Sequence, residues 1–151
     1  MRKRISINTL LKKINELSDK IDRIEKSLLP KEKKWLKFNE CIPPKSACKD
    51  IHSMLDGIND FTGFIGKLSE YYGCETMGIY IDETINPKYI AEYRPLMKTA
   101  YTKGKTVNIE TVLHEFFHHL CNLNVVIVNE KESEKCADEY ARIFMERVNG
   151  D

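Results

Sequence analysis

The sequence contains no apolar run that approaches the roughly 20 residues needed to cross a membrane as a helix. Its basic start resembles the beginning of a signal peptide, but Lys12, Lys13 and Glu16 interrupt the apolar segment that should follow. No sign of charge dominates either. The net charge is +1, which gives the whole molecule little electrostatic attraction to nucleic acid. We therefore expect a cytoplasmic protein that binds neither a membrane nor nucleic acid.

The cysteines lack a regular spacing. The chain has five cysteines, an odd number, and Cys41 and Cys48 lack the spacing of a zinc knuckle. This pattern favours reduced thiols over a disulfide framework. The 151 residues suffice for one modest core, and their ordinary content of apolar and charged residues argues against wholesale disorder.

What the chain does have at its start is a regular heptad pattern. Apolar residues recur at steps of three and four, which predicts an amphipathic helix over about residues 6–29 that ends before Pro30. A lone heptad helix cannot bury its apolar stripe, so it needs a partner. The apolar positions are Ile7, Leu10, Ile14, Leu17, Ile21, Ile24 and Leu28.

Two partners for this helix are open. A second helix predicted over about residues 50–72 repeats the rhythm, and the pair would form an antiparallel hairpin across an irregular linker, Lys31–Lys49. Alternatively, the first helix pairs with its copy in a homodimer or coiled coil. In either case the sequence predicts an N-terminal helical region, residues 1–72, followed by a second domain, residues 73–151.

The second domain mixes short strands with two helices, so the predicted fold class is α+β. Gly73 is expected to cap the helix before it, and Asn108 to begin the first helix of the domain. The predicted strands are Met77–Asp82, Tyr89–Tyr93, Thr99–Thr102, Thr106–Ile109 and Val125–Val128. The predicted helices are Ile109 to about Asn122 and about Lys131 to Val148.

The first of these helices carries a metal-binding pattern. His114 and His118 are four residues apart, so both rings project from one face and can hold one ion. Glu115 lies beside the first of them and supplies a carboxylate that can take a proton from an attacking water molecule. This H-E-x-x-H arrangement is typical of catalytic zinc sites.

A catalytic zinc needs a third protein ligand. The metzincin pattern would place glycine and histidine where this chain has Cys121 and Asn124, so that class is excluded. On the last helix, Glu134 and Asp138 form an E-x-x-A-D pattern, with Glu134 as zinc ligand and Asp138 as hydrogen-bond acceptor for His114. Other third ligands left open by the sequence are Glu130, Glu132 and Cys121.

These two motifs resemble gluzincin metallopeptidases of minimal size, the minigluzincins and the ImmA/IrrE-type peptidases. The resemblance covers roughly residues 77–148. It implies a zincin-like core in which a short sheet presents an edge strand, here about Ala100–Ile109, to an extended peptide substrate. The residue that would stabilise the transition state has no clear match, and the candidates are Tyr140, Tyr101 and His119.

The resemblance implies a zinc-dependent endopeptidase with Glu115 as general base. Two other interpretations stay open. In the first, the protein is a regulatory protease that cleaves one partner, such as a transcriptional repressor. In the second, it is a non-catalytic zinc-binding interaction module.

Overall fold

The computed structural model describes residues 6–28, 35–55, 60–104 and 107–150. The chain divides into two compact units, Met1–Lys33 and Lys34–Asp151, and each is described by itself. The division differs from the predicted boundary after residue 72, because the helices between residues 38 and 72 belong to the same core as the helices that follow. Among the described residues no helix has the length and apolar character needed to cross a membrane.

The first unit contains one helix, α1, over Ile7–Leu28. It matches the predicted heptad helix to within one residue at each end, while Pro30 lies outside the described residues. The hydroxyl of Ser6 accepts a hydrogen bond from the backbone N–H of Thr9 at 3.3 Å and so caps the helix start. Within this unit, the apolar stripe from Ile7 to Ile24 is exposed.

The helix predicted over residues 50–72 is wrong as one continuous element. Two helices replace it, α3 (Lys45–His52) and α4 (Thr62–Tyr72), and the short helix α2 (Phe38–Cys41) precedes them within the predicted linker. The chain turns after α3, and α4 starts close to that turn: a Cβ added at Gly63 would lie 3.1 Å from the carbonyl oxygen of Met54. The predicted antiparallel hairpin therefore lacks the continuous second helix that it requires. Gly73 does cap α4, with φ of 60°.

The sheet of the second unit has three strands in the order β2-β4-β3. Strands β2 (Gly78–Ile81) and β4 (Thr99–Thr102) are parallel, and β3 (Ala91–Arg94) is antiparallel to β4. Gly78 is required by the close approach of the first two, because a Cβ there would lie 2.6 Å from Oγ1 of Thr99. The strand predicted to begin at Thr106 is not formed over Val107 and Asn108, and residue 106 lies outside the described residues.

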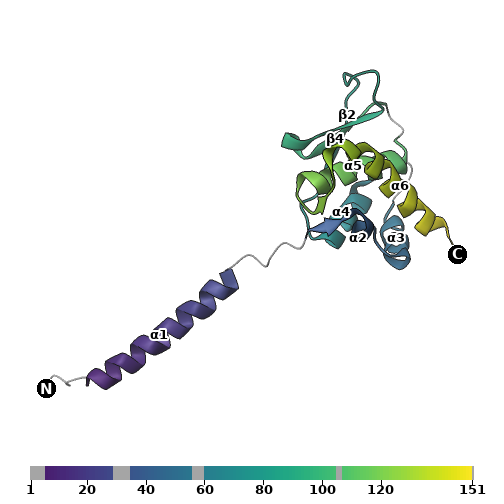
Figure 1. Ribbon diagram of the computed structural model, residues 1–151. Coiled ribbons are helices and arrows are strands. Elements are labelled where there is room, and N and C mark those ends of the chain that lie inside the picture. The colour runs from purple at the N-terminus through teal and green to yellow at the C-terminus, as the bar shows by residue number, and fades with distance from the viewer. Residues whose placement is uncertain (1–5, 29–34, 56–59, 105–106, 151) are drawn as a thin grey trace. The chain divides into compact units, whose positions relative to one another are not determined.

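The helices α5 (Ile109–Asn122) and α6 (Ser133–Asn149) form the centre of the unit. The sheet packs on one side of α5, and the helices α2, α3 and α4 lie on the other side of the α5–α6 pair (Figure 1). A buried aromatic group joins these layers, with the Phe64 and Phe144 rings in edge-to-face contact at 6.0 Å. A short 3₁₀ helix, η2 (Glu130–Glu132), leads into α6, and η1 (Pro95–Met97) follows β3. The strands β1 (Leu36–Lys37) and β5 (Val126–Ile127) form a separate parallel pair.

The five cysteines are all free, as the sequence predicts. Cys41 and Cys48 are buried, and the other three are partly exposed. Burial raises the pKa of Cys48 to about 11, so this thiol stays protonated and behaves as a small apolar side chain.

Candidate metal centre

Helix α5 places two imidazole rings side by side. Its start is fixed by Asn108, whose side chain accepts a hydrogen bond from the backbone N–H of Glu110 at 3.0 Å. One face of the helix is buried in the core, and the adjoining face carries His114 and His118, which are partly exposed. Their Nε2 atoms lie 3.1 Å apart. The four-residue spacing thus brings the two rings together as the sequence predicts.

Helix α6 adds a carboxylate to this pair. Ala137 is fully buried between the helices, and its small side chain permits the close approach of α6 to α5. One carboxylate oxygen of Glu134 lies 3.2 Å from Nε2 of His114, and the other lies 3.1 Å from Nε2 of His118. Within the described part of the chain, this is the one group of potential ligand atoms that converges closely enough to hold a metal ion. The open alternatives Glu130, Glu132 and Cys121 are not part of it.

The outer nitrogens of both rings have partners. Nδ1 of His114 lies 2.7 Å from Oδ1 of Asp138. A carboxylate only accepts hydrogen bonds, so this Nδ1 carries a proton, and in the neutral form of the ring the lone pair is at Nε2. Nδ1 of His118 lies 3.3 Å from the hydroxyl of Ser133. Such outer hydrogen bonds orient metal-binding imidazoles and fix their tautomers.

The spacing of the inner atoms, two imidazole nitrogens and the two oxygens of one carboxylate, fits a single metal ion. Zinc binds histidine nitrogen and carboxylate oxygen at about 2.0–2.2 Å, which puts neighbouring ligand atoms of a tetrahedron about 3.3 Å apart. The separations of 3.1–3.2 Å are close to that value. The lone pair of His114 also faces a carboxylate oxygen, and two acceptors so close repel each other unless a proton or a cation lies between them. The donor set therefore fits a divalent metal ion.

The charge state of the second ring is consistent with metal binding. Burial lowers the pKa of His118 below its usual value, although the carboxylate of Glu134 opposes the change. The ring is therefore neutral at physiological pH, and a neutral imidazole is the form that binds a metal.

Glu115 lies beside this group in the wall of a cleft of about 870 Å³. Its side chain is buried, with 6% exposed, and burial raises its pKa to about 7, with the charge of Glu134 adding to the rise and His114 opposing it. The backbone N–H of Tyr93 lies near this carboxylate and opposes the rise of its pKa. Glu115 is therefore held at the junction of α5 and the sheet.

The strand that lines the cleft is β3, and the predicted edge strand at Ala100–Ile109 is wrong. Residues 100–102 belong to β4, which is bonded on both sides and has no free edge. The cleft is lined instead by residues of β3 and its flanks, together with α5 and the start of α6. The order of the three strands, which depends on contacts between distant residues, decides which strand is free.

The backbone of β3 presents hydrogen-bonding groups to the cleft. The N–H of Lys103 donates to the carbonyl of Ile90 at 2.9 Å, and antiparallel pairing then directs the backbone groups of every second residue toward β4. Ala91 and Tyr93, which alternate with these, direct their N–H and C=O groups away from β4. The effect of the Tyr93 N–H on the pKa of Glu115 agrees with this assignment.

The structure places all three candidates for transition-state stabilisation outside the cleft. Tyr140 is fully buried in the core, where its hydroxyl lies 3.0 Å from that of Tyr72. Tyr101 packs against Tyr80, and the guanidinium of Arg94 lies 4.2 Å from its ring centre. Neither of these tyrosines lines the cleft.

The third candidate, His119, has both ring nitrogens engaged. Its Nε2 lies 2.6 Å from the carbonyl oxygen of Glu75, and its Nδ1 lies 2.7 Å from the hydroxyl of Tyr93. Because the carbonyl only accepts, Nε2 donates and Nδ1 accepts from the tyrosine. Asn122 donates to the same hydroxyl at 3.1 Å. His119 thus ties β3 to α5.

Two contributors to the site were not found from the sequence. The sequence already places Ser133 next to Glu134 at the start of α6. Its contact with His118, however, depends on how the two helices pack. The contribution of Tyr93 comes from its backbone, and no sequence pattern marks it.

Comparisons with known proteins assign no family to this chain. No protein-family description, no curated protein and no solved structure matches it. The function is therefore inferred from the geometry of this candidate metal centre and from the two motifs that form it.

Proposed function

We propose that this protein is a zinc-dependent endopeptidase of the gluzincin type, with His114, His118 and Glu134 as ligands. The observation that carries the proposal is the convergence of two imidazole nitrogens and one carboxylate at 3.1–3.2 Å, beside a buried glutamate in a cleft. Three protein ligands leave the fourth position of a tetrahedral zinc free, which is the arrangement of catalytic rather than structural sites.

Each group in the cleft then has a defined task. Bound zinc supplies Lewis acidity, which polarises the scissile carbonyl and lowers the pKa of a water molecule. Glu115 accepts a proton from that water and passes it to the leaving amine. Asp138 and Ser133 orient the two imidazoles.

The free backbone groups of β3 supply a binding mode for the substrate. An extended peptide can pair with the N–H and C=O groups of Ala91 and the C=O of Tyr93, as an added strand. This backbone pairing would run beside Glu115, whose carboxylate lies near the N–H of Tyr93. It would hold a peptide bond of any sequence near the metal, so side-chain pockets rather than the strand would set specificity.

The direct test is hydrolysis of unfolded protein by the purified chain. We expect cleavage with one zinc per chain. A chelator should remove roughly 90% or more of the activity, because zinc activates the attacking water, and adding zinc back should restore it. Cleavage sites are read by mass spectrometry of the products. A zinc-loaded chain that leaves both unfolded substrates and peptide libraries intact would contradict the endopeptidase proposal and favour a non-catalytic metal site.

Removing the outer hydrogen bond of His114 gives a graded effect. We expect Asp138→Asn to weaken zinc binding roughly 10–100-fold, because an amide holds the ring less firmly and lowers its basicity. Competition with a chromophoric chelator measures the affinity. Glu139→Gln, a matched change at the next residue of α6, should leave it unchanged, since Glu139 pairs with Arg142 rather than with the site. Equal affinities in the two variants would show that Asp138 does not orient His114.

A further inference from the structure

We propose that α1 is a dimerisation helix, and that two copies of this chain pair through it as a parallel two-stranded coiled coil. Within its own unit α1 has no partner for its apolar seam, and the exposed fractions from Ile7 to Ile24 range from 46% at Leu10 to 74% at Ile7. A stripe of this kind over 22 residues needs a partner helix of similar length. The predicted partner within the chain, a continuous helix over residues 50–72, does not exist.

The residue types in the seam favour two parallel strands. In the heptad register, Ile7, Ile14 and Ile21 occupy the a positions. Leu10, Leu17 and Ile24 occupy the d positions. Isoleucine at a with leucine at d is the combination that favours parallel dimers over trimers and tetramers.

The flanking charges distinguish parallel from antiparallel pairing. In a parallel dimer, a g residue of one helix faces the e residue five positions further on in the other helix. Lys20 then faces Glu25 of the second copy, and two-fold symmetry produces this attractive pair twice. In the antiparallel pairing that overlaps the whole seam, g residues face g residues, and Lys13 faces Lys20 twice. The charge pattern therefore complements a second parallel copy and opposes an antiparallel one.

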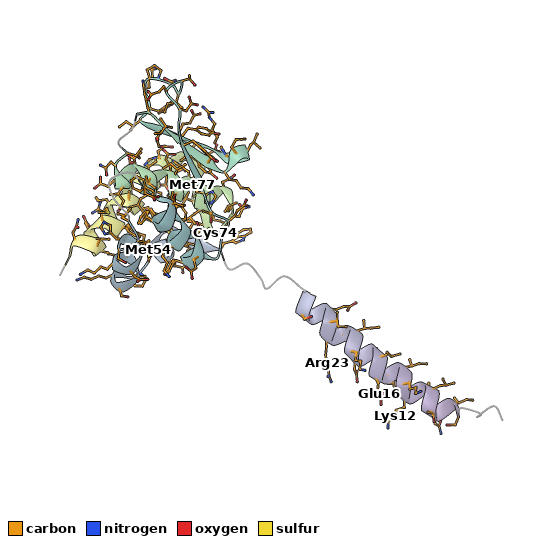
Figure 2. The ribbon with its side chains drawn as sticks, turned by 180° about the vertical axis from the view of Figure 1, so that it is seen from behind. Lys12, Glu16, Arg23, Met54, Cys74 and Met77 are labelled. Carbon is orange, nitrogen blue, oxygen red and sulfur yellow. The ribbon has the colours of Figure 1, made fainter. Side chains whose placement is uncertain are left out.

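The opposite face of α1 is charged and suits solvent. Figure 2 shows Lys12, Glu16 and Arg23 along this face. Lys12 and Lys20 are each four residues from Glu16, one on either side of it, so both can pair with Glu16 within the helix. Only Lys20 also borders the seam. These two lysines therefore make a matched pair of sites for a charge reversal.

The test is the dissociation constant of the full chain, measured by sedimentation equilibrium across the micromolar range. We expect a dimer that Lys20→Glu and Glu25→Lys each weaken roughly tenfold, because each reversal turns two attractions into two repulsions. The double variant, Lys20→Glu with Glu25→Lys, should recover the affinity of the natural chain. Lys12→Glu should change it by less than about threefold, since it disturbs only the pair within the helix. Leu17→Glu should give a monomer.

Folding of the variants has an independent readout. Every Trp, Tyr and Phe of the sequence lies after residue 34. Near-ultraviolet circular dichroism therefore reports the second unit alone and should be the same for all these variants. A monomeric natural chain would overturn the proposal. Tighter dimerisation of Lys20→Glu would overturn the parallel arrangement, because that is the result expected when Lys13 faces Lys20.

Discussion

Replacing Glu115 with glutamine is expected to lower kcat/KM for peptide hydrolysis by a factor on the order of 10³, while zinc stays bound. Glutamine has the same shape, and its amide oxygen can still face the N–H of Tyr93. It cannot accept the proton of the attacking water. The chemical step therefore loses its base, whereas the ligands His114, His118 and Glu134 are untouched.

Two measurements on the same preparation separate chemistry from structure: initial rates on a quenched fluorescent peptide, and zinc per chain. The matched control is Glu110→Gln, which makes the same change at an exposed position of the same helix. We expect this control to keep full activity. If Glu115→Gln cleaves as fast as the natural chain, Glu115 is not the general base, and the proposed mechanism is wrong even though the metal site stands.

Replacing Glu134 with alanine is expected to lower zinc affinity by more than roughly a hundredfold. Changes to groups that only orient the ligands typically lower metal affinity about 10–100-fold, and this change removes a proposed ligand itself. It also removes the negative charge that lies 3.1–3.2 Å from both imidazoles. Peptidase activity should fall with the zinc content. Because Glu134 is mostly exposed on the first turn of α6, its loss should leave the fold intact.

The controls for this experiment are the other acidic residues before α6. Glu130→Ala and Glu132→Ala should bind zinc as the natural chain does, because neither belongs to the converging group. Zinc retained in Glu134→Ala but lost in one of these variants would identify a different third ligand. It would also imply that the start of α6 moves when the metal binds.

Much of the metal centre could be predicted before the fold, because its parts are local. Helix α5 runs from Ile109 to Asn122 as predicted, since a cap at Asn108 and a regular apolar face define it within a few turns. Given that helix, the four-residue spacing alone puts His114 and His118 on one face. The same reasoning places Glu134 and Asp138 one turn apart on α6, and the two helices do bring all four together.

Other features depended on contacts between distant parts of the chain. The order of the strands makes β3 the free edge at the cleft and encloses β4, although both look alike as short apolar segments. The break after α3 is also a matter of packing, because the heptad rhythm of the sequence continues past residue 52 while the chain turns at Ser53 and Met54. The spacing of apolar residues along the sequence cannot reveal a turn that is stabilised by close approach to a neighbouring helix.

The roles of some polar residues could likewise be predicted from the sequence, whereas the roles of others depended on the tertiary structure. The pattern of the chain was enough to predict that His114 and His118 share a helix face with Glu115 beside them, since helical geometry fixes how residues four apart project. It could not show that Tyr140 is a core residue bonded to Tyr72, or that His119 holds β3 against α5. Those assignments depend on which elements pack together, and packing is settled by the burial of apolar surface over the whole unit rather than by any short stretch of sequence.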